Sequence, residues 1–377
     1  MVASGPACGW LADKWNGTQW LKIFGSLGDT LNNERATTFD NNQEEASSPF
    51  SSNIATVFAA DANVYEEVKA ALLALGVTSV NQLPIPAGGW GAGLPPAPQL
   101  KLAMGLEDEK NLFTMLLRIG VMASVDDRIA YMSSSPFSVL RVSRRPTAPA
   151  QDQSLFVGSV IDRTTTNTEE DLRDALEALV DAVKAHYSAG RVVQEVNSVK
   201  NLLGAQVDFG GFCYVGEVQC SGDNRDAYYS GTDPTVAFTQ ASDFNVVVGV
   251  NHQAFGTASY SNLVIYNGPR QVGVVGVTDV EYAGSAASFL AGTEYAGVSD
   301  YLYAYTFARD CTGLGDYCTV VPSTGWPLLP EFNPGTPQLS VAVFIDRAYV
   351  HPETHVGPHE DAILPPVQLR FSALPAA

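Results

Sequence analysis

Three of the five histidines of this chain lie in one short stretch, HPETHVGPHED (351–361). His351, His355 and His359 are four residues apart, a spacing that would stack the side chains on one face of a helix. The prolines and the glycine exclude a regular helix there, so we expect a loop. A turn in that loop would bring the imidazoles together, and Glu353 could add a carboxylate. Such a mixed set predicts a site for Zn, Cu, Mn or Fe; the alternative is a solvated polar loop.

His252 follows the apolar run FNVVVGV (244–250), which predicts a buried strand. Catalytic side chains often project from strand ends and from the loops behind them. The chain then turns into a second predicted strand, on which Tyr260 and Asn262 alternate and therefore share one face. We expect His252 to be an acid/base supported by Tyr260, with Asn251 and Asn262 contacting substrate. The alternative is a hydrogen-bonded histidine of the scaffold.

A polar stretch, CSGDNRDAYYSGTDPT, begins at Cys220 and is typical of a loop. Arg225 could hold a substrate there, Asp226 could assist proton transfer, and Tyr228 could add a contact. Calcium is a second candidate, because the segment Asp223–Asp233 offers several carboxylate and amide oxygens. A third reading of the same residues is an ion-pair network that only fixes the loop.

Two further arginines stand out because of their neighbours in the sequence. Asp346 and Arg347 interrupt the apolar run LSVAVFIDRAYV (339–350), so each charge lies on the solvent side of a strand or is paired inside. Arg309 lies two residues before Cys311 and is a candidate contact for substrate.

Four of the five cysteines form two pairs with equal spacing. Six residues separate Cys213 from Cys220, and six separate Cys311 from Cys318. Zinc sites favour about two to four residues between paired cysteines, so we expect two local disulfides, with cross-pairing or free thiols as alternatives. Disulfides belong to oxidising compartments, which favours an extracellular or periplasmic location.

The composition restricts the class of partner. The formal net charge is -19, from 21 Lys and Arg against 40 Asp and Glu. An acidic surface repels phosphate backbones and anionic lipid, which argues against nucleic-acid and membrane partners and favours a neutral or cationic small molecule or glycan. No stretch approaches the roughly 20 apolar residues of a membrane helix. Dinucleotide and P-loop motifs are missing, so we expect no nucleotide cofactor. The oligomeric state stays open.

The pattern of elements predicts an α+β fold. Residues 1–98 are expected to form an arm, a helix at 61–76 and a Pro/Gly-rich linker, and residues 99–204 a mixed region. Residues 205–377 carry short Val-, Tyr- and Phe-rich runs about ten residues apart, which predicts an antiparallel sandwich or barrel-like domain.

The clearest single element is the helix predicted at 168–190, TEEDLRDALEALVDAVKAHYSAG. Thr168 is its expected N-cap, Asp171 stands at the capping-box position three residues later, and Gly190 is expected at its end.

Two functions follow from these expectations. One is a secreted or periplasmic enzyme, hydrolase- or lyase-like, that acts on a small molecule or glycan at loops beside strand ends. The other is a non-catalytic extracellular binding or assembly protein with a β-rich domain that calcium could stabilise.

Overall fold

A computed structural model describes ten ranges of the chain: 54–77, 79–89, 125–134, 137–142, 153–158, 162–200, 226–232, 235–267, 272–322 and 341–374. Contacts between Cα atoms divide the chain into two compact units. Of the described residues, the first unit contains 162–200 and those from 226 onward, and the second contains those from 54 to 158. The first unit, which holds the β-rich region, also contains the helix predicted at 168–190.

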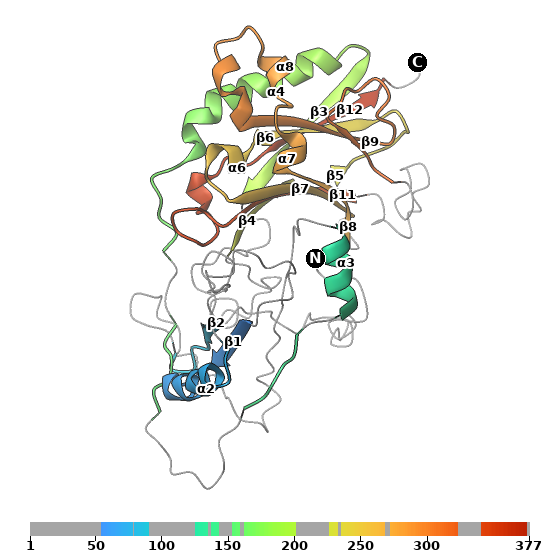
Figure 1. Ribbon diagram of the computed structural model, residues 1–377. Coiled ribbons are helices and arrows are strands. Elements are labelled where there is room, and N and C mark those ends of the chain that lie inside the picture. The colour runs from blue at the N-terminus through green and yellow to red at the C-terminus, as the bar shows by residue number, and fades with distance from the viewer. Residues whose placement is uncertain are drawn as a thin grey trace, which may run out of the picture. The chain divides into compact units, whose positions relative to one another are not determined.

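The β-rich unit is built on one curled sheet of ten strands (Figure 1). The order is β10-β9-β6-β12-β3-β4-β11-β7-β8, and β5 pairs with β11. All described pairs in it are antiparallel except that of β10 with β9, so the sheet is mixed. The strands are β3 Arg191–Lys200, β4 Ala227–Thr232, β5 Thr235–Val236, β6 Phe244–Val250, β7 Tyr260–Asn267, β8 Val272–Thr278, β9 Leu302–Ala308, β10 Cys318–Val320, β11 Val341–Tyr349 and β12 Val367–Ala373.

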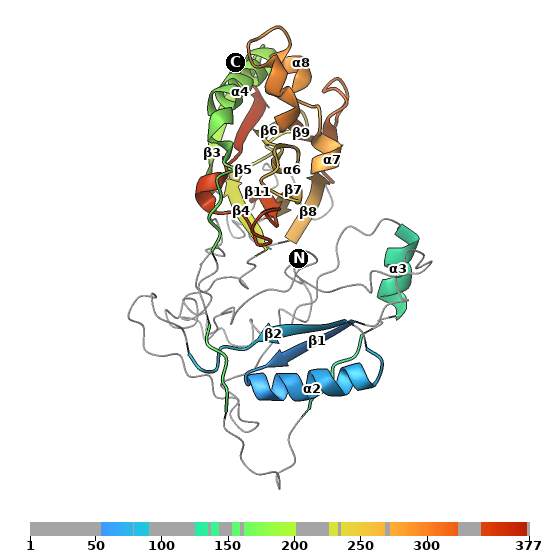
Figure 2. The same cartoon turned by 60° about the vertical axis from the view of Figure 1, so that its left-hand side comes forward.

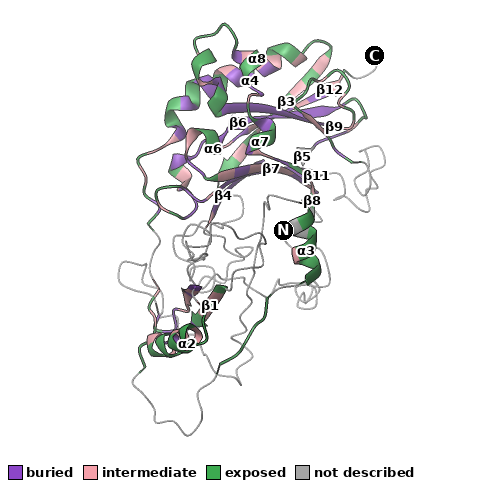
Figure 3. Cartoon of the chain, in the orientation of Figure 1, coloured by how far each residue is buried: buried purple, intermediate pink, exposed green. Residues whose placement is uncertain are grey.

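The curl brings the two halves of the sheet face to face. Phe307 of β9 lies 5.4 Å from Phe344 of β11 between ring centroids, and both belong to one buried cluster with Val247 of β6 and Leu263 of β7. This cluster is the inner core. Buried residues concentrate along these strands (Figure 3).

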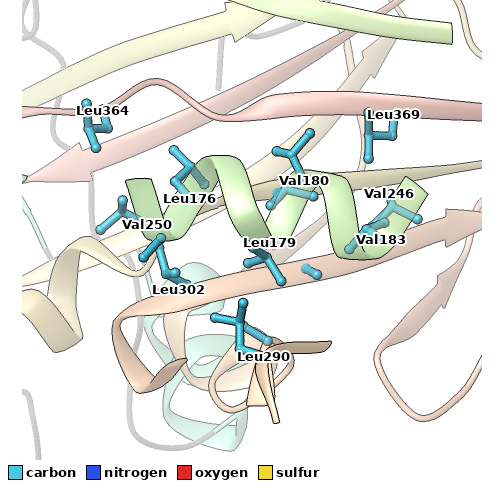
Figure 4. Close-up of a cluster of buried hydrophobic side chains, with 14 of the residues drawn as sticks. Leu176, Leu179, Val180, Val183, Val246, Val250, Leu290, Leu302, Leu364 and Leu369 are labelled. Carbon is cyan, nitrogen blue, oxygen red and sulfur yellow. The ribbon is translucent and has the colours of Figure 1, made fainter. Parts of the chain in front are cut away.

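One helix covers the outer side of the β6–β9–β12 half. This helix, α4 (Arg173–Tyr187), directs Leu176, Leu179, Val180 and Val183 toward the sheet, where a second core forms (Figure 4). Adjacent residues of β6 pack alternately into the two cores, because strand side chains alternate between faces. The other helical segments of the unit are η2 Glu169–Leu172, α6 His252–Phe255, α7 Asp279–Tyr282, α8 Ala287–Leu290, η3 Ala296–Tyr301 and η5 Glu360–Ala362.

The second unit contains a parallel pair of strands, β1 (Ile54–Ala59) and β2 (Ser79–Pro84), joined by α2 (Ala62–Ala74). Figure 2 shows α2 lying along this pair. The helix predicted at 61–76 is confirmed: the Asp61 side chain accepts the amide of Asn63 at 2.8 Å, as an N-cap does. A further helix, α3, spans Val125–Ser134.

The α+β class and the β-rich region are therefore confirmed, and the described strands of that region form a half-barrel. The run FNVVVGV coincides with β6. The prediction of a loop from Cys220 onward was wrong in part, because residues Ala227–Thr232 form β4, a buried strand between β3 and β11. Within the described residues, no helix is long and apolar enough to cross a membrane.

The structure contains one of the two expected disulfides. Cys311 and Cys318 are bonded, with a Cα–Cα distance of 5.8 Å, and both contact the core under α4. Cys213 and Cys220 lie outside the described residues.

Candidate functional site

His252 lies wholly buried between two carboxylates. Its Nδ1 is 2.6 Å from Oε1 of Glu169, and its Nε2 is 2.8 Å from Oδ2 of Asp346. All three side chains are at most 1% exposed. Glu169 also accepts hydrogen bonds from the Thr257 hydroxyl and from the amide of Leu364, the latter at 2.8 Å. We call these three charged residues the buried triad.

The electrostatics of the buried triad favour a charged histidine. Burial alone would lower the pKa of His252, but the negative charges of Glu169 and Asp346 and their hydrogen bonds outweigh it and raise the pKa to about 10. His252 is therefore an imidazolium at neutral pH and donates to both carboxylates. A protonated, fully buried histidine with both nitrogens engaged suits a scaffold role better than that of a general base.

Glu169 is the member of the triad that the sequence did not single out. It follows Thr168, where a capping box was expected, but the Thr168 side chain makes no capping hydrogen bond. The helical segment begins instead with the 3-10 turn η2, which directly precedes α4, and the Glu169 side chain is buried against His252. In the sequence, Glu169 looks like any acidic residue of a first helical turn.

Asp346 also affects two buried tyrosines on the inner side of the sheet. Burial, first of all, and then the charge of Asp346 raise the pKa values of Tyr282 and Tyr303 well above the usual value. The Tyr282 hydroxyl is 2.6 Å from the Ser261 hydroxyl. Among the described residues, Oδ1 of Asp346 has no hydrogen-bond partner. The inner cluster is thus rich in ionisable groups yet closed to solvent.

Asn251, expected to contact substrate, is the N-cap of α6. Its Oδ1 accepts the amide of Ala254 at 3.2 Å, and its Nδ2 donates to the carbonyl of Asp279 at 3.4 Å. The side chain is 2% exposed, so its contacts orient His252 at the start of α6.

A second cluster lies on the other face of the same strands. Arg347 of β11 is opposite Asn262 of β7, and its Nη1 donates to Asn262 Oδ1 at 3.2 Å. Its Nη2 donates to the Tyr266 hydroxyl at 2.5 Å. Asn262 Nδ2 in turn donates to the Tyr260 hydroxyl at 3.2 Å. Four polar side chains therefore form one continuous chain of hydrogen bonds.

Tyrosine rings surround this chain. The guanidinium carbon of Arg347 lies 5.2 Å from the ring centroids of both Tyr229 and Tyr266, within the range of cation–π attraction. The ring of Tyr349 lies 5.5 Å from that of Tyr260. The tyrosine face, as we call it, consists of Tyr229, Tyr260, Asn262, Tyr266, Arg347 and Tyr349.

Burial differs across the tyrosine face. Along β7, half-buried residues at 260, 262, 264 and 266 alternate with buried residues at 261, 263, 265 and 267. Tyr349 is also half-buried, whereas Arg347 is 8% and Tyr229 5% exposed. Tyr266 and Tyr349 pack against a third buried cluster on this face, formed by Ala227, Tyr229, Val343 and Ile345. The half-buried aromatic and amide groups therefore adjoin this cluster and a buried cation.

The sheet separates residues that were expected to act together. Asp346 pairs in register with Leu263 of the inner core, and Arg347 pairs with Asn262. His252 therefore lies on the inner side of the sheet and Tyr260 on the outer side, so these two do not converge on one substrate.

The remaining described site residues are Tyr228 and Arg309, expected to contact substrate, and Asp226, expected to assist proton transfer. Tyr228 is fully buried in a small core with Ala348. Arg309 donates to the carbonyls of Val321 and Pro322 and lies 4.9 Å from the ring centroid of Phe238. The structure describes Asp226, half-buried, with its carbonyl accepting the amide of Val350 at 2.7 Å.

Arg225, Asp223 and Asp233 fall outside the described residues. The calcium site that the sequence predicts there stays a prediction.

The three histidines of 351–361 lie in a loop, as predicted, but have different surroundings. His351 is buried, and its Nδ1 accepts the amide of Glu353 at 3.1 Å while its Nε2 is 3.2 Å from the Thr165 hydroxyl. His359 caps η5, with Nδ1 accepting the amide of Asp361 at 3.2 Å. His355 has a positive φ of 56°.

Among the described residues, no group of three or more His, Cys, Asp or Glu side chains could hold a metal ion. The metal site expected in this loop remains a prediction.

Comparison of the chain with protein-family models, with curated proteins and with solved structures finds no match.

Proposed function

We propose that this chain is a non-catalytic binding protein that holds a saccharide on the tyrosine face. The carrying observation is the contrast between the two sides of β7 and β11. The inner side holds the fully buried His252, and the outer side presents half-buried tyrosines joined to an amide and a guanidinium.

The residue types of the tyrosine face suit a sugar ring. Tyrosine combines a large apolar ring, on which the C–H face of a pyranose can pack, with a hydroxyl that bonds to sugar oxygens. Binding sites for small ligands are typically aromatic surfaces with a few fixed polar groups. Asn262 and Arg347 are such groups, because each is held by hydrogen bonds to a neighbouring side chain.

Rigidity of the platform also supports binding. Tyr260, Asn262 and Tyr266 all extend from β7, which is paired with β11 on one side and β8 on the other. Contacts built on paired strands are positioned more accurately than contacts on loops, so less conformational entropy is lost when a ligand binds.

The proposed location is extracellular or periplasmic. The Cys311–Cys318 disulfide is compatible with an oxidising compartment, where proteins that bind glycans outside the cell would reside.

A hydrolase- or lyase-like activity, the function that the sequence analysis gives first, is the alternative to this proposal. It would need an acid/base other than His252, since that residue is protonated and enclosed. Within the described residues, the buried triad therefore supports the binding function more than the catalytic one.

Calorimetric titration against a panel of neutral and acidic oligosaccharides tests the proposal. We expect saturable binding to at least one of them, lost in Tyr260→Ala and in Tyr266→Ala. The matched control is Tyr317→Ala, which removes a 38% exposed tyrosine beyond the tyrosine face and should leave affinity unchanged.

Thermal melting of each variant confirms that it is folded. Absence of binding to the whole panel, or binding that survives both substitutions in folded protein, would reject the proposed function. Turnover of any panel member would instead favour the enzyme.

A further inference from the structure

Arg347 has no carboxylate partner among the described residues. Its side chain donates to an amide oxygen and a phenol, and two tyrosine rings lie against it. Burial opposes its charge, yet interactions with the tyrosines raise the pKa of Arg347, so it remains a cation. Buried charges in proteins are usually paired, because an uncompensated one is costly.

One other largely buried arginine of the same unit shows the usual arrangement. Arg370, whose side chain is 11% exposed, lies 3.2 Å from the carboxylate of Asp243. The carboxylate nearest to Arg347 in sequence, Asp346, is on the opposite face and bonds His252. The positive charge of the tyrosine face is therefore left for a group that is not among the described side chains.

The direction of the hydrogen bonds indicates the chemistry of that group. Arginine only donates, so the amide atom of Asn262 that faces it must be Oδ1, which turns Nδ2 toward Tyr260. The hydroxyls of Tyr260 and Tyr266 both accept in this chain of bonds. Among the described residues neither hydroxyl donates, so each keeps a hydrogen for a ligand. The face thus offers donors, and its best complement is a group that only accepts.

The net charge limits how many anionic groups the ligand can carry. A protein with a formal charge of -19 repels a polyanion at long range. One guanidinium can still pair with one anionic group, and its planar fork matches the planar carboxylate in two parallel hydrogen bonds.

From these observations we infer that the tyrosine face binds a saccharide unit bearing a single carboxylate, as a uronic acid does. Arg347 pairs with the carboxylate, the hydroxyls of Tyr260 and Tyr266 donate to the ligand, and a tyrosine ring packs on the sugar face. This inference rests on the proposed function and adds the charge of the ligand to it.

Matched sugars that differ only at the carboxylate test the inference. The probes are methyl glucuronide, its methyl ester and methyl glucoside, with the corresponding galacto and manno sets, titrated by calorimetry. In at least one set we expect the uronide to bind about tenfold or more tightly than its ester and its neutral glycoside, which is the effect of one charge-assisted pair. The preference should shrink as sodium chloride is added, because salt screens the pair.

Substitutions of Arg347 then test whether this residue causes the preference for the uronide. In Arg347→Gln the uronide and the glycoside should bind equally, and Arg347→Lys should keep only part of the preference because it lacks the planar fork. Arg191→Gln is the control, since its guanidinium also lies over an aromatic ring, 4.7 Å from the centroid of Phe244, away from this face. It should leave the preference unchanged.

The outcomes separate this inference from the proposed function. If the wild type binds the uronide, its ester and the neutral glycoside with equal affinity, recognition of a carboxylate is overturned, whereas saccharide binding still holds. A preference that persists in folded Arg347→Gln would also overturn it. If Arg347→Gln does not fold, the wild-type comparison of uronide with ester still decides. Failure of every sugar to bind would overturn both proposals.

Discussion

Asp346 and Arg347 are neighbours on β11, and their side chains lie on opposite faces of the curled sheet. Asp346 is hydrogen-bonded to His252 inside the sheet, and Arg347 to Asn262 and Tyr266 outside it. Alternation along a strand enforces this separation. Two adjacent residues of opposite charge therefore contribute to two independent clusters instead of pairing with each other.

Removal of the imidazole should destabilise the fold strongly. His252→Ala leaves the carboxylates of Glu169 and Asp346 buried without a cation, and breaking a buried ion pair in this way costs about 3–5 kcal/mol. Urea denaturation followed by circular dichroism measures the free energy of unfolding. His186→Ala, at an exposed position near the end of α4, should change that free energy by less than about 0.5 kcal/mol. Equal stability of the two variants would contradict a structural role for the triad.

Stability should fall as the pH rises from neutral. The pKa of His252 is raised from 6.5 to about 10, so the folded state binds a proton that the unfolded state has released in this window. The stabilisation is complete below about pH 6.5 and is lost as the pH approaches 10. The free energy of unfolding should therefore decrease by about 1.4 kcal/mol for each pH unit.

Denaturation curves between about pH 7 and pH 9 measure this effect below the range in which ordinary tyrosines and lysines titrate. A folded Glu169→Gln variant should show a shallower dependence, since one of the two charges that raise the pKa is gone. A flat profile in the wild type would show that His252 is neutral in the folded protein.

Gly357 should not tolerate a side chain. A Cβ at this position would lie 2.6 Å from the backbone nitrogen of Ala227, at the start of β4, so backbone would have to move. We expect Gly357→Ala to lower the free energy of unfolding by about 1–3 kcal/mol, the usual cost of overpacking. Gly297→Ala is the matched control, because a Cβ there has nothing within 4 Å. Similar melting temperatures for the two variants would mean that the loop packs differently against β4.

The Cys311–Cys318 bond should stabilise the β-rich unit modestly. The bond closes a loop with a sequence separation of 7, which corresponds to roughly 2–3 kcal/mol in the chain-entropy model. Peptide mapping without reduction should recover the linked pair. A Cys311→Ser/Cys318→Ser double variant should fold with a lower melting temperature. Recovery of both cysteines as alkylated thiols from native protein would refute the bond.

Several elements were predictable because their signals are local. The helix predicted at 61–76 corresponds to α2 and the run FNVVVGV to β6, and alternation placed Tyr260 and Asn262 on one face. β4 was missed because its sequence, AYYSGT, lies among Asp, Asn and Gly residues that are typical of loops.

The sequence by itself determined the α+β class and the alternation of β7. It also limited each charge of β11 to one of two environments, the solvent side of the strand or a paired position inside. Only the tertiary structure decided that Glu169 and Asp346 meet His252, from which they are 83 and 94 residues away in sequence. Periodicity reports which side of a strand is buried, because it depends on neighbouring residues alone. Which residues contact a side chain on that face depends on how the sheet curls, and the curl is a property of the whole chain.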